Sequence, residues 1–132
     1  MARALVVLLV AGEGLMPAVT ADGLRIYGYD VLTAADGASA VEQVRALRRL
    51  DVLVVDAELG GEVDGLSAAR LARELNSKLE VIYTARVPHL IPERAKVPGA
   101  PCVRAPYHPF QIASVISALK HRPARDEFDQ VA

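Results

Sequence analysis

Cysteine and large aromatic side chains are almost absent from this sequence. The 132 residues include one cysteine and no tryptophan, and aromatic residues make up only 5% of the chain. A single cysteine, Cys102, excludes an intrachain disulfide and a zinc site built from several cysteines. We expect it to be a small buried side chain. The hydrophobic 52% of the chain is therefore mostly aliphatic, which suits alternating strands and helices without excluding a helical bundle.

The chain also lacks an excess of charge of either sign. Its 15 Lys and Arg residues oppose 16 Asp and Glu residues, which leaves a formal net charge of -1. This balance gives no electrostatic reason to expect nucleic acid or an anionic membrane as a partner. One local basic cluster, formed by Arg45, Arg48 and Arg49, is expected to be the solvated face of a helix.

No apolar run is long enough to cross a membrane. The run from Ala4 to Ala11 has eight residues, whereas a membrane helix needs about 18 or more. A basic residue precedes this run, so a signal peptide has to be considered. A first buried strand explains the run more simply, and we expect a cytoplasmic protein.

Apolar periodicity and turn residues predict five strands that alternate with five helices. The expected strands are Val6–Val10, Tyr29–Thr33, Val52–Val55, Glu80–Thr84 and Cys102–Arg104. The expected helices are Leu15–Tyr27, Ala38–Leu50, a segment from the N-cap Asp64 to about Asn76, a short one around Ile91–Lys96, and Pro109–His121. Three prolines between residues 88 and 98 break the fourth helical region, so we expect a mobile connection around that short helix.

This alternation predicts an α/β fold with a doubly wound, five-stranded parallel sheet and helices on both faces. We assign residues 1–121 to this domain. Residues 122–132 are polar and acidic and have little apolar surface to bury. We therefore expect them to form a C-terminal tail.

The first candidate functional residue is Asp56. It directly follows Val52–Val55, a continuous apolar run typical of a strand that is buried on both faces. Its carboxylate should then lie at the carboxyl edge of the sheet, where open α/β folds place their ligands. The alternative is an ordinary capping or turn aspartate. The loops after the other strands should bring Gly12, Glu13, Thr84 and Ala105 to the same edge.

Four segments of the chain carry a family resemblance. They are GYDVLTAADGASAVEQV, DVLVVDAELGGEVDGLSAARLAREL, VIYTAR and VRAPYHPFQI. In this order and at this spacing they resemble the receiver domain of bacterial two-component response regulators, over about residues 3–121. The resemblance implies the flavodoxin-like, receiver-type fold of the chemotaxis regulators, and a signalling domain rather than an enzyme.

Two of the family's functional positions are kept in this sequence. By the resemblance, Asp56 matches the phosphoacceptor, an ionised carboxylate that attacks a phosphorus atom. Thr84 matches the switch residue, whose hydroxyl binds a phosphoryl oxygen and draws the next loop inward. The implied partners are a sensor histidine kinase or phosphotransfer protein upstream and an effector protein downstream.

The acidic pair that holds Mg2+ in the family is missing. Its positions fall on Ala11 and Gly12, which have no carboxylate. Mg2+ requires oxygen ligands in near-octahedral geometry. The remaining candidate ligands are Asp56, a backbone carbonyl near Glu58, and Glu13, for which a solvated loop acid is the preferred interpretation. The resemblance thus implies a magnesium cofactor for which this sequence retains few ligands.

The family's lysine is also missing, because its position falls on Ala105, followed by Pro106 where the family has a cis-proline. By the resemblance, that lysine neutralises charge on the transferred phosphoryl group. Arg86 and His108 are close along the chain, but we expect both to be surface residues. Cys102 stands where the family often has an aromatic switch residue, so coupling through an aromatic rotamer is not expected.

Three functions remain open at this point. The first is a receiver domain in a phosphorelay, with Asp56 as acceptor. The second is a pseudo-receiver, a phosphorylation-independent interaction module that uses the fourth-helix region, the fifth strand and the last helix; the resemblance also implies a homodimer through the last-helix region. The third, a small enzyme or nucleotide binder, is disfavoured because no GxGxxG or P-loop motif occurs. Phosphoryl transfer depends on positioning and electrostatics, so the missing groups favour slow or absent transfer.

Overall fold

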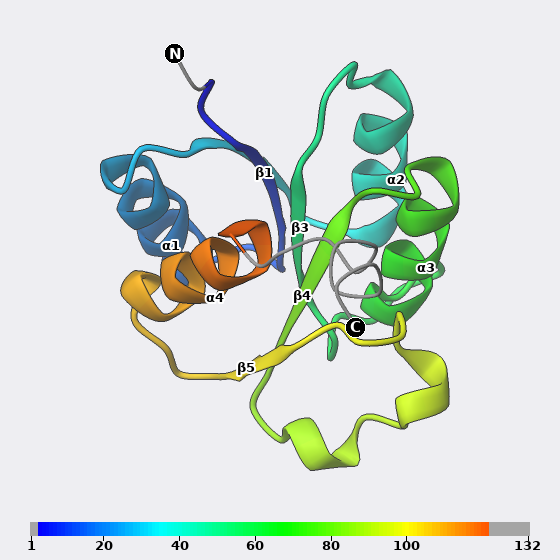
Figure 1. Cartoon of the computed structure of the whole chain (residues 1–132). Coiled ribbons are helices and arrows are strands. Elements are labelled where there is room, and N and C mark those ends of the chain that lie inside the picture. The colour runs from blue at the N-terminus through cyan, green and yellow to red at the C-terminus, as the bar shows by residue number, and fades with distance from the viewer. Residues whose placement is uncertain (1–2, 122–132) are drawn as a thin grey trace, which may run out of the picture.

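Figure 1 shows the computed structural model of the chain, which describes residues 3–121. The strands are β1 (Val6–Val10), β2 (Asp30–Ala34), β3 (Val52–Asp56), β4 (Glu80–Ala85) and β5 (Cys102–Arg104). The α-helices are α1 (Leu15–Ile26), α2 (Gly37–Ala46), α3 (Gly65–Leu75) and α4 (Pro109–His121). Two 3₁₀ segments, η1 (Pro88–Leu90) and η2 (Glu93–Ala95), lie between β4 and β5.

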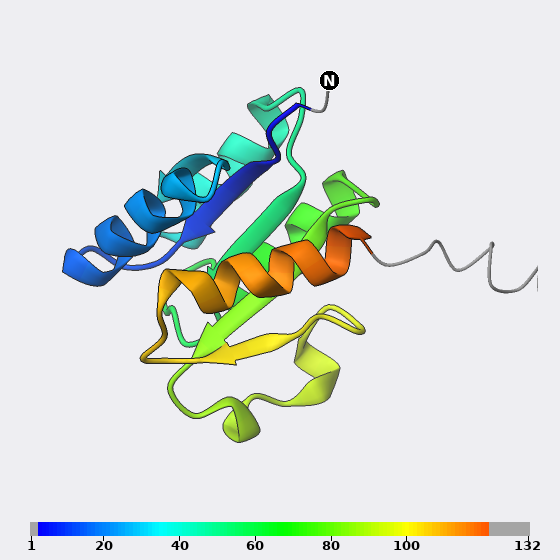
Figure 2. The same ribbon diagram turned by 60° about the vertical axis from the view of Figure 1, so that its left-hand side comes forward.

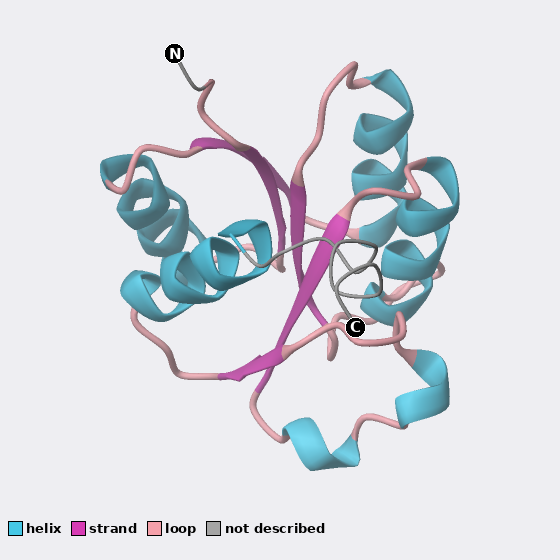
Figure 3. Cartoon of the chain, in the orientation of Figure 1, coloured by secondary structure: helices cyan, strands magenta, loops and turns pink. Residues whose placement is uncertain are grey.

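All five strands form one parallel sheet in the order β2-β1-β3-β4-β5. Helices α1 and α4 pack together on one face of the sheet, and α2 and α3 pack together on the other (Figures 1 and 3). Figure 2 shows the same three layers from a second direction. The predicted doubly wound parallel sheet with helices on both faces is confirmed.

The hydrophobic core has two halves, one on each face of the sheet. Alternate residues of β1 point to opposite faces, so Val7 and Leu9 pack under α1 and α4, while Leu8 and Val10 pack under α2 and α3. All four side chains are buried. Because both faces are covered, the central strands read as continuous apolar runs and not as an alternating pattern.

Helix caps follow the polar side chains that the sequence provides. The carboxylate of Asp36 accepts the N–H of Ser39 at 2.8 Å, and that of Asp64 accepts the N–H of Ser67 at 2.8 Å. These bonds satisfy backbone donors that the first turn leaves without a helical partner. The N-cap predicted at Asp64 is confirmed. Gly28, which follows α1, has a φ of 95° in the left-handed region that glycine favours.

The glycine within α1 has a packing role. A Cβ built on Gly23 would lie 2.5 Å from the Cβ of Pro109, the first residue of α4. The absence of a side chain therefore allows α4 to begin directly against α1. Glycine in a helix lowers its stability by about 1 kcal/mol relative to alanine, and here this close approach offsets that loss.

Helix α2 ends four residues earlier than the sequence predicts. It stops at Ala46, and Leu47 has extended dihedral angles of -77° and 130°. The extended chain brings Leu50 into the core, where it is 6% exposed. The prediction that Arg45, Arg48 and Arg49 share one helix face is therefore wrong for Arg48 and Arg49, which follow the end of α2. Arg49 instead pairs with Asp51, at 3.1 Å from Nε to Oδ2.

The expected fourth helix is also corrected, since η1 and η2 replace a single short helix around Ile91–Lys96. Side chains of the domain hold the connection at two points. The buried hydroxyl of Tyr83 accepts the N–H of Val97 at 2.9 Å, and Arg70 donates to the carbonyl of Ala95 at 2.8 Å. Prolines remove the N–H groups that a continuous helix would need, so anchoring by side chains takes their place.

Other boundaries agree with the sequence predictions to within one residue, and those of β1, β5 and α4 coincide with them. Cys102 differs from expectation because its side chain is partly exposed. The tail predicted for residues 122–132 lies outside the described residues.

Candidate functional site

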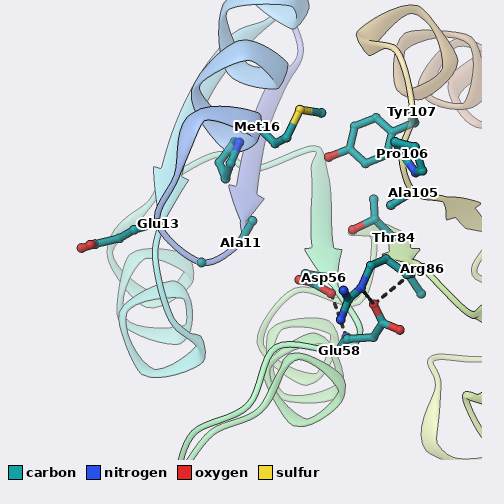
Figure 4. A pocket seen from close by; sticks show the side chains of 13 residues that line it. Ala11, Glu13, Met16, Asp56, Glu58, Thr84, Arg86, Ala105, Pro106 and Tyr107 are labelled. Carbon is teal, nitrogen blue, oxygen red and sulfur yellow. Dashed lines mark hydrogen bonds and ion pairs between the residues drawn. The ribbon is translucent and has the colours of Figure 1, made fainter.

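A pocket of about 440 Å³ opens at the carboxyl edge of the sheet (Figure 4). Its lining comes from the ends of β1, β3, β4 and β5 and from the first turn of α1. The lining residues are Ala11, Gly12, Glu13, Met16, Pro17, Asp56, Glu58, Thr84, Ala85, Arg86, Ala105, Pro106 and Tyr107. The pocket therefore brings together six positions singled out in the sequence, which are Ala11, Gly12, Glu13, Asp56, Thr84 and Ala105, whereas Cys102 and His108 do not line it.

Asp56 is the last residue of β3 and is partly buried in this pocket. Its Oδ1 accepts the N–H of Glu58 at 2.8 Å. Burial raises the pKa of its carboxyl group, and the charge of Glu58 adds to this effect. The hydrogen bond from the Glu58 amide and the charge of Arg86 act in the opposite direction without cancelling the shift.

Thr84 lies next to Asp56 because the two residues are in register on β3 and β4. It is 7% exposed, and its carbonyl accepts the N–H of Ala57 at 2.9 Å. Figure 4 shows its side chain beside the methyl group of Ala105 at the pocket. A carboxylate and a hydroxyl on neighbouring strands are thereby brought to the same side of the cavity.

The loop after β1 contributes no acid to the centre of the pocket. Ala11 and Gly12 line it without any polar side-chain atom. The side chain of Glu13 is exposed and points away from Asp56 (Figure 4). The structure thus brings Ala11 and Gly12 to Asp56 but directs the third candidate, Glu13, into solvent.

The loop after β5 likewise contributes no cation. Ala105 is joined to Pro106 by a cis peptide bond, as expected for this position, and its N–H donates to the carbonyl of Ala85 at 2.8 Å. His108 is not among the lining residues; its Nδ1 accepts the N–H of Phe110 at 3.0 Å. His108 therefore serves the start of α4 and does not substitute for a lysine.

Glu58 and Arg86 close the pocket by linking the loops after β3 and β4. The Glu58 carboxylate accepts the backbone N–H of Arg86 at 2.9 Å and that of Val87 at 3.4 Å. The Arg86 Nε lies 3.6 Å from the same carboxylate. The hydrogen bond from the Arg86 amide is the main reason why the pKa of Glu58 is lowered. Sequence reasoning missed this link, for which an acid two residues after Asp56 was the only signal.

The side chains around Asp56 do not fit Mg2+. In the described residues, no group of three His, Cys, Asp or Glu side chains is placed to hold a metal ion. Glu58 is engaged by two backbone amides and a guanidinium, and Glu13 points away. One carboxylate and backbone carbonyls are a poor match for an ion that demands a near-octahedral set of oxygens.

This architecture was compared with those of known proteins. No protein-family model matches the sequence, and no curated protein matches it either. A response regulator receiver protein from Sinorhizobium medicae is structurally similar, with a TM-score of 0.81 and 25% identity over 88% of this chain and 94% of that one. The N-terminal domain of a response regulator/sensory box/GGDEF protein from Carboxydothermus hydrogenoformans matches with a TM-score of 0.71 and 26% identity, over 86% and 91% of the two chains.

This chain has the receiver-domain fold. The resemblance predicted from the four sequence segments is thereby confirmed at the level of the fold. A third similar structure is the receiver domain of a sensor histidine kinase from Pseudomonas aeruginosa, with a TM-score of 0.74 and 24% identity over 88% of this chain and 97% of that one. That receiver domain has a magnesium ion coordinated in its active site cleft.

Residues 3–121 contain four α-helices and two 3₁₀ segments. None of the helices described there has the length and apolar character needed to cross a bilayer.

Proposed function

We propose that this chain is a receiver-type signalling module of a two-component system that acts through protein contacts, without Mg2+-assisted phosphorylation of Asp56. One observation carries the proposal. The pocket keeps Asp56 and Thr84, but methyl groups and a glycine stand where an acidic pair and a cation would be needed. Phosphoryl transfer relies on positioning and on charge stabilisation. Ala11, Gly12 and Ala105 can neither position an incoming phosphoryl group nor stabilise its charge.

The proposed partners are those of two-component signalling. A cytoplasmic histidine kinase or phosphotransfer protein would bind upstream, and an effector protein would bind downstream. The surface proposed for the effector comprises the η1–η2 connection, β5 and α4. Leu90 on η1 is 69% exposed there, and the anchoring of Val97 by Tyr83 holds this connection in one arrangement. A surface fixed in this way can be recognised without a phosphorylation-driven change.

The second candidate is a phosphorelay receiver in which Asp56 is the phosphoacceptor. It is favoured by the accessible carboxylate of Asp56 and by its register with Thr84. In that reaction a carboxylate oxygen forms a bond to phosphorus while the bond from phosphorus to the leaving group breaks. The register of Thr84 with Asp56 on the neighbouring strand supports a role for its hydroxyl in binding a phosphoryl oxygen.

Intact-protein mass spectrometry after incubation with acetyl phosphate and Mg2+ separates the two candidates. We expect no gain of a phosphoryl group on this chain. The acidic ligands for Mg2+ are missing, and Ala105 provides no cation at the position of the lysine. The receiver domain from Pseudomonas aeruginosa, which has a magnesium ion in its cleft, is the positive control. Asp56→Asn is the negative control, because it keeps the amide-accepting oxygen and removes the nucleophile.

Labelling of this chain at the rate of the positive control would overturn the proposal, provided that Asp56→Asn abolishes it. Labelling that persists in Asp56→Asn would locate the reaction at another residue, and would equally exclude Asp56 as the acceptor. Thermal unfolding with and without Mg2+ provides an independent readout. We expect no Mg2+-dependent rise in melting temperature.

A further inference from the structure

The pocket has one polar side and one apolar side. Met16 and Tyr107 lie close together on one side of it, with Ala105 and Pro106 next to the tyrosine (Figure 4). The hydroxyl of Tyr107 lies 3.4 Å from that of the fully buried Thr20 on α1. The aromatic ring therefore bridges the loop after β5 and the first helix. Apart from these two hydroxyl groups, Met16, Pro106 and the ring of Tyr107 give this side of the pocket an apolar surface.

The carboxylate of Asp56 is incompletely paired. Its Oδ1 accepts the amide of Glu58, and within residues 3–121 no ion pair is formed by either oxygen. The cationic Arg86 lies nearby, but its Nε pairs with Glu58 and its side chain is 82% exposed. Glu58 and Arg86 balance each other's charge and Glu13 points away, so the charge that faces the pocket is the negative charge of Asp56. An anion is disfavoured there, and a cation is favoured.

The volume and lining match a small organic ligand better than an ion. Small-molecule sites are typically cavities of about 300–1,000 Å³ with a largely apolar lining and a few polar groups that fix orientation. The volume of about 440 Å³ falls in this range. Asp56 supplies the orienting group, and Met16 and Tyr107 supply apolar contact surface.

We propose that the Asp56 pocket binds a small organic cation, a primary ammonium group attached to an aromatic or aliphatic body. The ammonium donates to the free oxygen of Asp56, and the body packs against Met16 and Tyr107. The inference rests on the proposed function only in that the pocket holds neither a phosphoryl group nor Mg2+. Arg86 lines the pocket and lies two residues before η1, so a ligand of this kind would couple a small molecule to partner binding.

Benzylammonium is a suitable probe, followed by two-dimensional amide NMR of the full chain. We expect saturable shift changes centred on the amides of Ala11, Gly12 and Ala105. Benzyl alcohol has the same ring but no charge. It should bind at least tenfold more weakly, a difference of about 1.4 kcal/mol, because it cannot form a charge-assisted hydrogen bond with Asp56.

Two variants form a matched pair of controls. Asp56→Asn should raise the dissociation constant for benzylammonium about tenfold or more, for the same reason. Glu13→Gln removes the same charge from the same pocket rim, but its carboxylate points away from Asp56, so it should leave the dissociation constant unchanged. A third variant, Ala105→Lys, places a tethered ammonium at the wall and should compete with the probe.

The inference would be overturned by equal binding of benzylammonium to Asp56→Asn and to the parent chain, or by equally tight binding of benzyl alcohol. Lysine with blocked termini carries the same ammonium group as a protein side chain. If it bound more tightly than benzylammonium, a partner's lysine would replace the small molecule as the ligand. Phosphoryl labelling of Asp56 would overturn the proposed function, and saturable binding of benzylammonium to the unlabelled chain would then still support this inference. Absence of benzylammonium binding would overturn this inference alone.

Discussion

Asp56 carries its charge in a setting that disfavours ionisation. Burial raises the pKa of this carboxyl group in the folded chain above its ordinary value. The contribution of the group to stability is therefore greatest below the unfolded-state pKa and is lost as pH rises through the folded-state pKa. At neutral pH the ionised carboxylate lowers the free energy of unfolding.

Asp56→Asn should accordingly raise the melting temperature at pH 7. The gain should shrink as pH falls toward 4, because the parent aspartate then becomes protonated. Thermal unfolding followed by circular dichroism across this pH range measures the effect. Glu13→Gln, at an exposed side chain, should give no such gain. A stabilisation that does not vary with pH would show that ionisation of Asp56 is not its cause.

Gly65 determines how closely α3 approaches the end of β3. A Cβ at this position would lie 2.0 Å from the carbonyl oxygen of Asp56, so Gly65→Ala must displace the helix from the site. Overpacking of this kind typically destabilises a protein by about 1–3 kcal/mol, measurable by urea unfolding. Gly60→Ala is the control, since nothing lies within 4 Å of the added Cβ; its effect should be within about 0.5 kcal/mol. Equal effects of the two variants would contradict the packing argument.

At the scale of elements, the connection from β4 to β5 depends on the Tyr83 hydroxyl. Tyr83 is fully buried, and its hydroxyl accepts the N–H of Val97 at 2.9 Å. Tyr83→Phe leaves this buried amide without its acceptor, which should lower the free energy of unfolding by about 1–2 kcal/mol. Hydrogen exchange at the Val97 amide should accelerate at the same time.

The control for this variant is Tyr27→Phe, because Tyr27 is 47% exposed and water can solvate its hydroxyl. Its effect on the free energy of unfolding should be close to zero. If Val97 exchanged at the same rate in Tyr83→Phe and in the parent chain, the hydroxyl would not be what anchors η1 and η2. The fixed surface proposed for effector binding would then lose its structural basis.

At the scale of the whole molecule, the site is a product of the strand order. The chain runs from β1 outward to β2 and then crosses to β3 on the other side of β1. Such a switch point places the loops after β1 and β3 on either side of a crevice. Ala11 and Asp56 therefore line the same pocket, although many residues separate them in the sequence. The register of β3 and β4 then adds Thr84.

Most of the fold could be predicted from the sequence because its signals are local. A buried strand shows as an apolar run, a helix as a stripe, and a cap as Asp64 before Ser67. Predictions failed where contacts distant in sequence decided the outcome. Helix α2 stops early because Leu50 is buried in the core and Arg49 pairs with Asp51, and neither contact is visible in helical periodicity.

The sequence by itself determined which side chains the site contains and which it lacks. It places Asp56 after a buried strand and Thr84 at the end of the next, and it supplies no acid at Ala11 or Gly12 and no cation at Ala105. Only the tertiary structure decided what surrounds these residues. Glu13 points away from Asp56, Glu58 is held by Arg86, and Tyr107 forms a wall of the pocket against α1. The direction of a loop side chain depends on partners from distant segments, and the folded chain alone brings those partners together.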